Sequence, residues 1–106
     1  MRGYPFLAEL YDDDYYPKGL LDRASGILLA LCRRIEAERP ASLKQLYRLT
    51  HAATEEFNVL AKVFEAHDSQ IETVARDCIG MDFAAIAKAY GFAKADVEEL
   101  IAPRDW

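Results

Sequence analysis

The chain has 106 residues, of which 52% are hydrophobic and 29% charged, so it supports one folded domain and excludes both intrinsic disorder and a second domain. The formal net charge is -5 and uneven: residues 1–50 carry eight basic against seven acidic side chains, and residues 51–106 carry five against eleven. Because an acidic protein repels nucleic acid and acidic membrane surfaces, we expect a basic protein partner, no nucleic acid and no membrane.

The first residues, Met1 to Phe6, form no apolar leader, and no stretch of about 18 apolar residues follows. We therefore expect a cytoplasmic protein. Cys32 and Cys78 lie in apolar helical stretches, where free core thiols are the favoured interpretation. The alternative is a disulfide between them, which requires their helices to meet at the right spacing.

The N-terminal part begins with a short aromatic segment, Tyr4 to Tyr16. A helix is expected from about Lys18 to Glu38, because Pro17 suits a helix start and Pro40 a helix end. Its apolar stripe is wide, which favours packing on more than one side.

Three later helix starts have the spacing of a capping box, a short polar N-cap residue followed three positions on by Glu or Gln. They are Ser42 with Gln45, Ser69 with Glu72, and Asp96 with Glu99. The helix from Ser42 can continue to about Ala66, as one long helix or two collinear ones, with apolar positions at heptad spacing. This seam comprises Leu43, Leu46, Thr50, Ala53, Phe57, Leu60 and Phe64.

The helix from Ser69 is expected to break at Gly80, after which Asp82 can cap a further helix that ends at Gly91. A last helix should span about Val97 to Ile101. Since no strand-like alternation occurs, the sequence predicts an all-α, single-domain bundle of about four main helices with short terminal helices.

The C-terminal corner from Ile86 to Leu100 has the small, apolar and glycine positions of a helix-turn-helix. Its second helix is acidic, with Asp96, Glu98 and Glu99 where contact with phosphate needs Lys or Arg. We therefore expect a structural corner and no DNA binding.

Two groups of side chains are candidates for function. His51 and Glu55 lie four residues apart on one helix face, so they could hold a metal or position a base. They make half a site at best, and a surface contact is the simpler interpretation. We predict no cofactor.

The second group is the acidic and aromatic run Tyr11, Asp12, Asp13, Asp14, Tyr15 and Tyr16. Adjacent carboxylates favour water or a basic partner, and tyrosine is enriched at interface hot spots. This run is the candidate partner-binding surface. The alternative is a solvated loop that its tyrosines anchor to the bundle.

Several stretches together resemble a family of small acidic bacterial proteins catalogued as a domain of unknown function. They are Tyr11-Asp12-Asp13, Tyr16-Pro17-Lys18, Leu49 to Glu55, Cys78-Ile79-Gly80, Ala89 to Phe92, and Glu99 to Trp106. The resemblance covers nearly the whole chain and implies a bacterial, stand-alone domain. It implies no activity and no catalytic residues.

Two functional hypotheses follow. Small size, net acidity and the lack of a catalytic motif favour a non-enzymatic protein-binding module, such as an immunity or inhibitor protein that neutralises a basic partner. The alternative is a small metal-dependent or acid–base enzyme that brings His51 and Glu55 together with Asp12–Asp14.

Overall fold

A computed structural model describes residues 1 and 3–106, and within them all regular structure is helical. The helices are α1 (Ala8–Tyr11), α2 (Lys18–Glu38), α3 (Leu43–Ala66), α4 (Thr73–Ala89) and α5 (Val97–Leu100). The prediction of an all-helical bundle is therefore confirmed. None of the helices in the described chain is long and apolar enough to cross a membrane.

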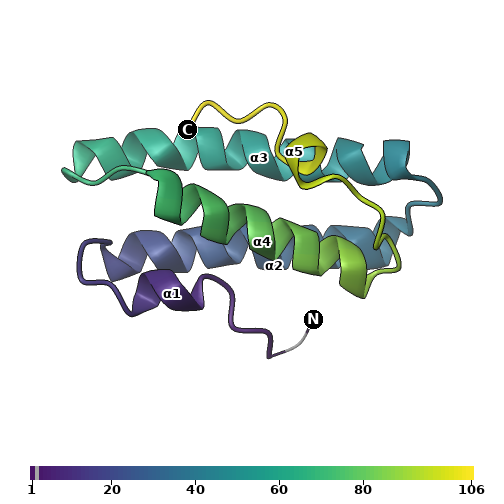
Figure 1. The fold of residues 1–106 in the computed structure, drawn as a ribbon, viewed down its shortest axis with the longest axis horizontal. Helices are drawn as coiled ribbons and strands as arrows, with labels where there is room; N and C mark the ends of the chain where they lie inside the picture. Colours follow the sequence, from purple (N-terminus) through teal and green to yellow (C-terminus); the bar gives the residue numbers. More distant parts are fainter. Residues whose placement is uncertain (2) are drawn as a thin grey trace.

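The long helices α2 and α3 lie antiparallel along the 40 Å axis of the molecule, and α4 lies in front of them between α1 and α5 (Figure 1). The core between them is built from fully buried side chains on every element. Its largest members include Leu7, Leu21, Leu28, Leu46, Phe57, Phe83, Ile86 and Leu100.

Helix α3 is one continuous helix of 24 residues, which decides between the two predicted forms. Its predicted heptad seam is buried from Leu46 to Phe64, with Leu43 partly buried at its start. Ser42 caps this helix, since its Oγ accepts a hydrogen bond from the Gln45 N–H at 3.2 Å. The Gln45 side chain accepts a hydrogen bond from the Ala41 N–H at 2.6 Å, whereas in a capping box it would bond to the N–H of Ser42 itself.

The predicted helix start at Ser69 is wrong, because Ser69 belongs to the end of α3. The Ser69 N–H donates to the Phe64 carbonyl at 2.9 Å and the Asp68 N–H to the Glu65 carbonyl at 3.1 Å. With Asp68 in the left-handed region (φ 56), these bonds form a Schellman motif, which ends a helix. Helix α4 begins four residues later, at Thr73, without a side-chain cap.

The predicted break at Gly80 is also wrong, since α4 runs through it from Thr73 to Ala89. Gly80 is buried under the α5 region, where a Cβ would lie at ordinary contact distances, 3.4 Å from Val97 and 3.5 Å from Ile101. The helix does end at Gly91, as predicted, with φ 92 and a bond from the Phe92 N–H to the Ala87 carbonyl at 2.8 Å.

Candidate functional site

The predicted partner-binding run lies mainly in the connection between α1 and α2, and its residues differ in accessibility. Tyr16 is only 4% exposed and belongs to the core. Tyr11 is half-buried, and its hydroxyl donates to the Asp22 carboxylate at 2.6 Å. Asp12, Asp13, Asp14 and Tyr15 are exposed, so these four residues form the accessible part of the run.

Tyr15 is 46% exposed, yet the surrounding structure holds it in place. Its ring packs edge-on against the buried Tyr16 ring, with centroids 4.9 Å apart. Its N–H donates to the Asp13 carboxylate at 2.9 Å. Tyr15 is therefore an exposed aromatic side chain, next to three aspartates in the sequence, that its contacts hold in place.

The fold adds a second acidic segment to this one. The connection between α3 and α4 lies at the same end of the bundle as the connection between α1 and α2 (Figure 1). The two segments approach each other at Tyr16: burial raises the pKa of this phenol, and the negative charges of Asp13 and Glu72 raise it further. We call the exposed carboxylates of this region the acidic end: Asp12, Asp13, Asp14, Glu65, Asp68 and Glu72.

Charge at the acidic end is left largely uncompensated. The ion pairs between described residues lie elsewhere, at Arg34–Glu38, His51–Glu99 and Arg104–Glu98. Lys18 adds one positive charge beside the run, and its Nζ donates to the neutral Tyr11 carbonyl instead of to a carboxylate. The opposite end of the bundle, where α2 joins α3 and α4 joins α5, has the reverse balance. Its cations Arg33, Arg34, Arg39, Lys44, Lys88 and Lys94 outnumber the acids Glu36, Glu38 and Asp96.

The predicted metal or polar site at His51 and Glu55 is not brought together with the aspartates. His51 Nε2 lies 2.6 Å from the Glu99 carbonyl of α5, and its ring stacks on Tyr47. Glu55 is exposed one turn further along α3. Asp12–Asp14 belong to the connection between α1 and α2, which lies at the end of the bundle where α3 ends (Figure 1), and His51 lies about 22 Å of helix axis before that end. Within the described part of the chain, no cluster of three or more His, Cys, Asp or Glu side chains could hold a metal ion.

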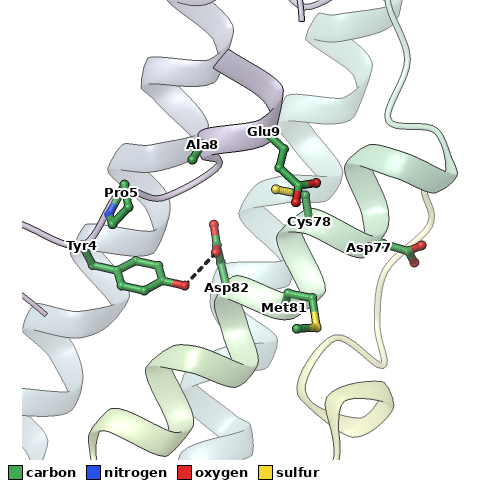
Figure 2. A pocket seen from close by; sticks show the side chains of 8 residues that line it. All are labelled: Tyr4, Pro5, Ala8, Glu9, Asp77, Cys78, Met81 and Asp82. Atoms are coloured by element: carbon green, nitrogen blue, oxygen red, sulfur yellow. Dashed lines mark hydrogen bonds between the residues drawn. The ribbon is translucent and has the colours of Figure 1, made fainter. Parts of the chain in front are cut away.

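One cleft was not anticipated from the sequence. It has a volume of about 330 Å³ and lies between the N-terminal segment and α4, lined by Tyr4, Pro5, Ala8, Glu9, Asp77, Cys78, Met81 and Asp82. Figure 2 shows the Asp82 carboxylate turned toward Tyr4 and the Glu9 carboxylate beside the Cys78 thiol.

Asp82 holds the N-terminal segment onto α4 in this cleft, in place of its predicted role as a helix cap. Its carboxylate accepts the Leu7 N–H at 2.7 Å and the Tyr4 hydroxyl at 3.4 Å. Leu7 has φ 58, a left-handed conformation that costs a leucine about 1–2 kcal/mol. A buried acceptor at its N–H therefore stabilises a turn that the local sequence does not favour.

The thiol in this cleft is partly buried and lies beside two carboxylates. Burial raises the pKa of the Cys78 thiol to about 11, and the charges of Asp82 and Glu9 raise it further. A thiol with that pKa is protonated at neutral pH and is a weak nucleophile. Cys78 and Cys32 are both free cysteines, with Cys32 buried as predicted and Cys78 half-buried at the cleft wall.

The C-terminal corner has α5 packed on α4 after the turn at Gly91. Helix α5 is a single turn of four residues, capped by the Asp96 carboxylate, which accepts the Glu98 N–H at 3.0 Å. The predicted partner Glu99 faces His51 instead. The position of a recognition helix is therefore occupied by a single turn that carries Glu98 and Glu99.

Fold and surface together define a small all-helical protein with one acidic end. The chain belongs to DUF5713, a family of unknown function whose family model matches residues 1–106. This match confirms the family resemblance that the sequence indicates. Neither the curated proteins nor the solved structures contain a match.

Proposed function

We propose that this protein is a non-enzymatic binding module whose acidic end recognises a basic protein partner, in the manner of an immunity or inhibitor protein. One observation carries the proposal: two segments far apart in the sequence lie at the same end of the bundle and together carry six exposed carboxylates and one exposed tyrosine (Figure 1).

The electrostatics favour rapid association with a positively charged surface. Carboxylates that are exposed and unpaired add little to the stability of the fold. Grouped at one end of a molecule 40 Å long, they create a field that attracts and orients a basic partner. A basic groove in the partner would receive the acidic end without burying an unpaired charge on either side.

Tyr15 supplies the apolar contact that charge alone cannot. Interfaces derive most of their affinity from a few aromatic or arginine anchors surrounded by polar residues. Because Tyr15 already packs on Tyr16, little side-chain entropy remains to be lost when a partner covers it.

Affinity capture with a matched control tests the proposal. Wild-type protein, the variant Asp12→Asn/Asp13→Asn/Asp14→Asn and the control Glu38→Gln/Glu55→Gln/Glu56→Gln are immobilised and exposed to lysate of the source cell at about 50 mM salt. Both variants lose three exposed carboxylates, but only the first loses them from the acidic end. We expect a basic protein that wild type and control retain and the Asp variant does not.

The purified partner then distinguishes specific binding from simple charge attraction. Tyr15→Ala should weaken binding by about 2 kcal/mol, or about 30-fold, with little change in association rate. Identical sets of proteins captured by wild type and the Asp variant would refute the assignment to the acidic end. An unchanged affinity for Tyr15→Ala would remove Tyr15 as its anchor.

A further inference from the structure

The solvent side of α4 is unusually apolar for an exposed helix face. Val74 is 60% and Met81 67% exposed, the highest values among the large apolar side chains apart from Val59. Only four charged residues occur in α4, and Asp82 is buried while Arg76 donates to the Trp106 carbonyl. A helix that is apolar on all sides is normally covered on all sides.

The exposed residues of this face have the spacing of a coiled-coil seam. Steps of three, four, three and four residues connect Val74, Asp77, Met81, Ala84 and Lys88. This is the a and d spacing of a heptad repeat, with Ala84 partly buried and the other four residues exposed. We call these five residues the α4 seam.

The shape around the α4 seam also suits a second helix. Asp77 and Met81 line clefts on both sides of α4, one of about 330 Å³ toward Tyr4 and one of about 380 Å³ toward Val97. The seam is therefore a ridge between two grooves. Ridges that fit into grooves are the usual basis of helix–helix packing.

We propose that the α4 seam pairs with the α4 seam of a second copy of this chain, antiparallel and about a two-fold axis between Met81 and Ala84. In an antiparallel pair each a residue faces a d residue of the partner. This register sets the large Met81 opposite the small Ala84, and Asp77 opposite Lys88. Both contacts occur twice, as a two-fold interface requires.

Charge complementarity selects this occupant and this direction. Asp77 and Lys88 form no ion pair with any described residue of their own chain, and they bear opposite charges on the two sides of the Met81–Ala84 pair. A parallel pair would set Asp77 against Asp77 and Lys88 against Lys88, which repel. Antiparallel pairing also turns the acidic end of each copy toward the cation-rich opposite end of the other.

Sedimentation of the full chain over a concentration series reaching about 1 mM tests this inference, which does not rest on the proposed function. Because the seam spans only two heptads, we expect a dimer with a Kd in the micromolar range. Wild type should then change from its 12.0 kDa monomer to twice that mass as concentration rises. Met81→Lys should remain monomeric, with an unchanged circular dichroism spectrum as the check that it folds.

Charge reversals test the register. Asp77→Lys and Lys88→Asp should each weaken the dimer about tenfold, and the double variant should restore it, because opposite charges then meet again. Glu55→Lys, a control exposed on α3 and belonging to neither the acidic end nor the opposite end, should dimerise as wild type does. A wild-type monomer at about 1 mM, or a dimer that neither Met81→Lys nor the single reversals weaken, would overturn the proposal.

Discussion

Asp82 is the only buried carboxyl group among the described residues, and it decides how the N-terminal segment is held. Replacing it by Ala would leave the buried Leu7 N–H without an acceptor and should lower the free energy of unfolding by about 1–3 kcal/mol. Asp82→Asn keeps an acceptor oxygen there and should cost clearly less. Urea unfolding of both variants checks this, and equal losses would show that the contact with Leu7 is not what matters.

The same residue gives a pH dependence with a definite sign. Burial raises the pKa of Asp82 above its ordinary value of 3.8, and the bonds from Leu7 and Tyr4 only partly oppose this. The folded state therefore binds the Asp82 proton more tightly than the unfolded state does. The stabilisation that this provides is fully present below pH 3.8 and is lost as the pH rises through the raised pKa.

Asp82→Asn does not titrate, so its unfolding free energy relative to wild type should increase from about pH 4 to about pH 7. Urea titrations of the two proteins in parallel measure the difference, in which the other titrating groups cancel. A relative stability that decreases over this range would mean that the ionised carboxylate stabilises the fold.

The two wrongly assigned residues show where a local pattern stops being informative. Ser69 and Asp82 are both good N-cap residues, and each precedes an apolar run. Ser69 is 1% exposed, and its N–H donates to the Phe64 carbonyl in the Schellman motif that ends α3. The carboxylate of Asp82 is used by Leu7, 75 positions earlier in the chain. Neither partner is visible in the residues that surround these positions.

At the level of the helices, Gly80 within α4 and Gly91 just after its end should respond in opposite ways to replacement by alanine. At Gly80 a Cβ would meet Val97 and Ile101 at ordinary contact distances, so Gly80→Ala should stabilise the fold by up to about 1 kcal/mol through helix propensity. Gly91 has φ 92, where alanine is strained, so Gly91→Ala should destabilise by about 1–2 kcal/mol. Paired urea titrations decide, and a loss of stability for Gly80→Ala would indicate that α5 cannot yield to a methyl group.

Helix α3 contributes the central contact of the core through Phe57. This ring is fully buried, 5.9 Å from the Phe83 ring and 6.0 Å from the Trp106 ring. Phe57→Ala should cost about 3–5 kcal/mol and should also change the fluorescence of Trp106, the only tryptophan. A loss below about 1 kcal/mol would mean that the core closes around the missing ring without a cavity.

The long elements could be predicted because their signals are local. Pro17 and Pro40 frame α2, and the Ser42 cap with its heptad seam defines α3 as far as Ala66. Helix α4 was divided at Gly80 because a glycine lowers helix propensity in any sequence. The helix nevertheless runs through Gly80, which is buried beside Val97 and Ile101 of the α5 region, and this packing is a property of the folded chain.

For the whole molecule, half of the candidate site could be read from the sequence. Asp12–Asp14 are adjacent in the chain, so their cluster is evident in one segment. The contribution of Glu65, Asp68 and Glu72 depends on α2 and α3 being antiparallel, which sets two distant connections at one end. The sequence shows a net acidic second half but not that its charges join those of the first.

The distribution of charge over the whole molecule also predicts that duplex DNA is not bound. The opposite end has an excess of only three cations, Arg34 there is paired with Glu38, and the net charge of the chain is -5. Counterion release, which drives most non-specific affinity for DNA, therefore has few cations to act through. The corner that resembles a helix-turn-helix presents Glu98 and Glu99 on a single turn.

A gel-shift with mixed duplexes at about 50 mM salt, where electrostatic binding is strong, should show free DNA only. Retardation that Arg39→Glu or Lys94→Glu abolishes would instead show that the opposite end binds phosphate despite the acidic net charge.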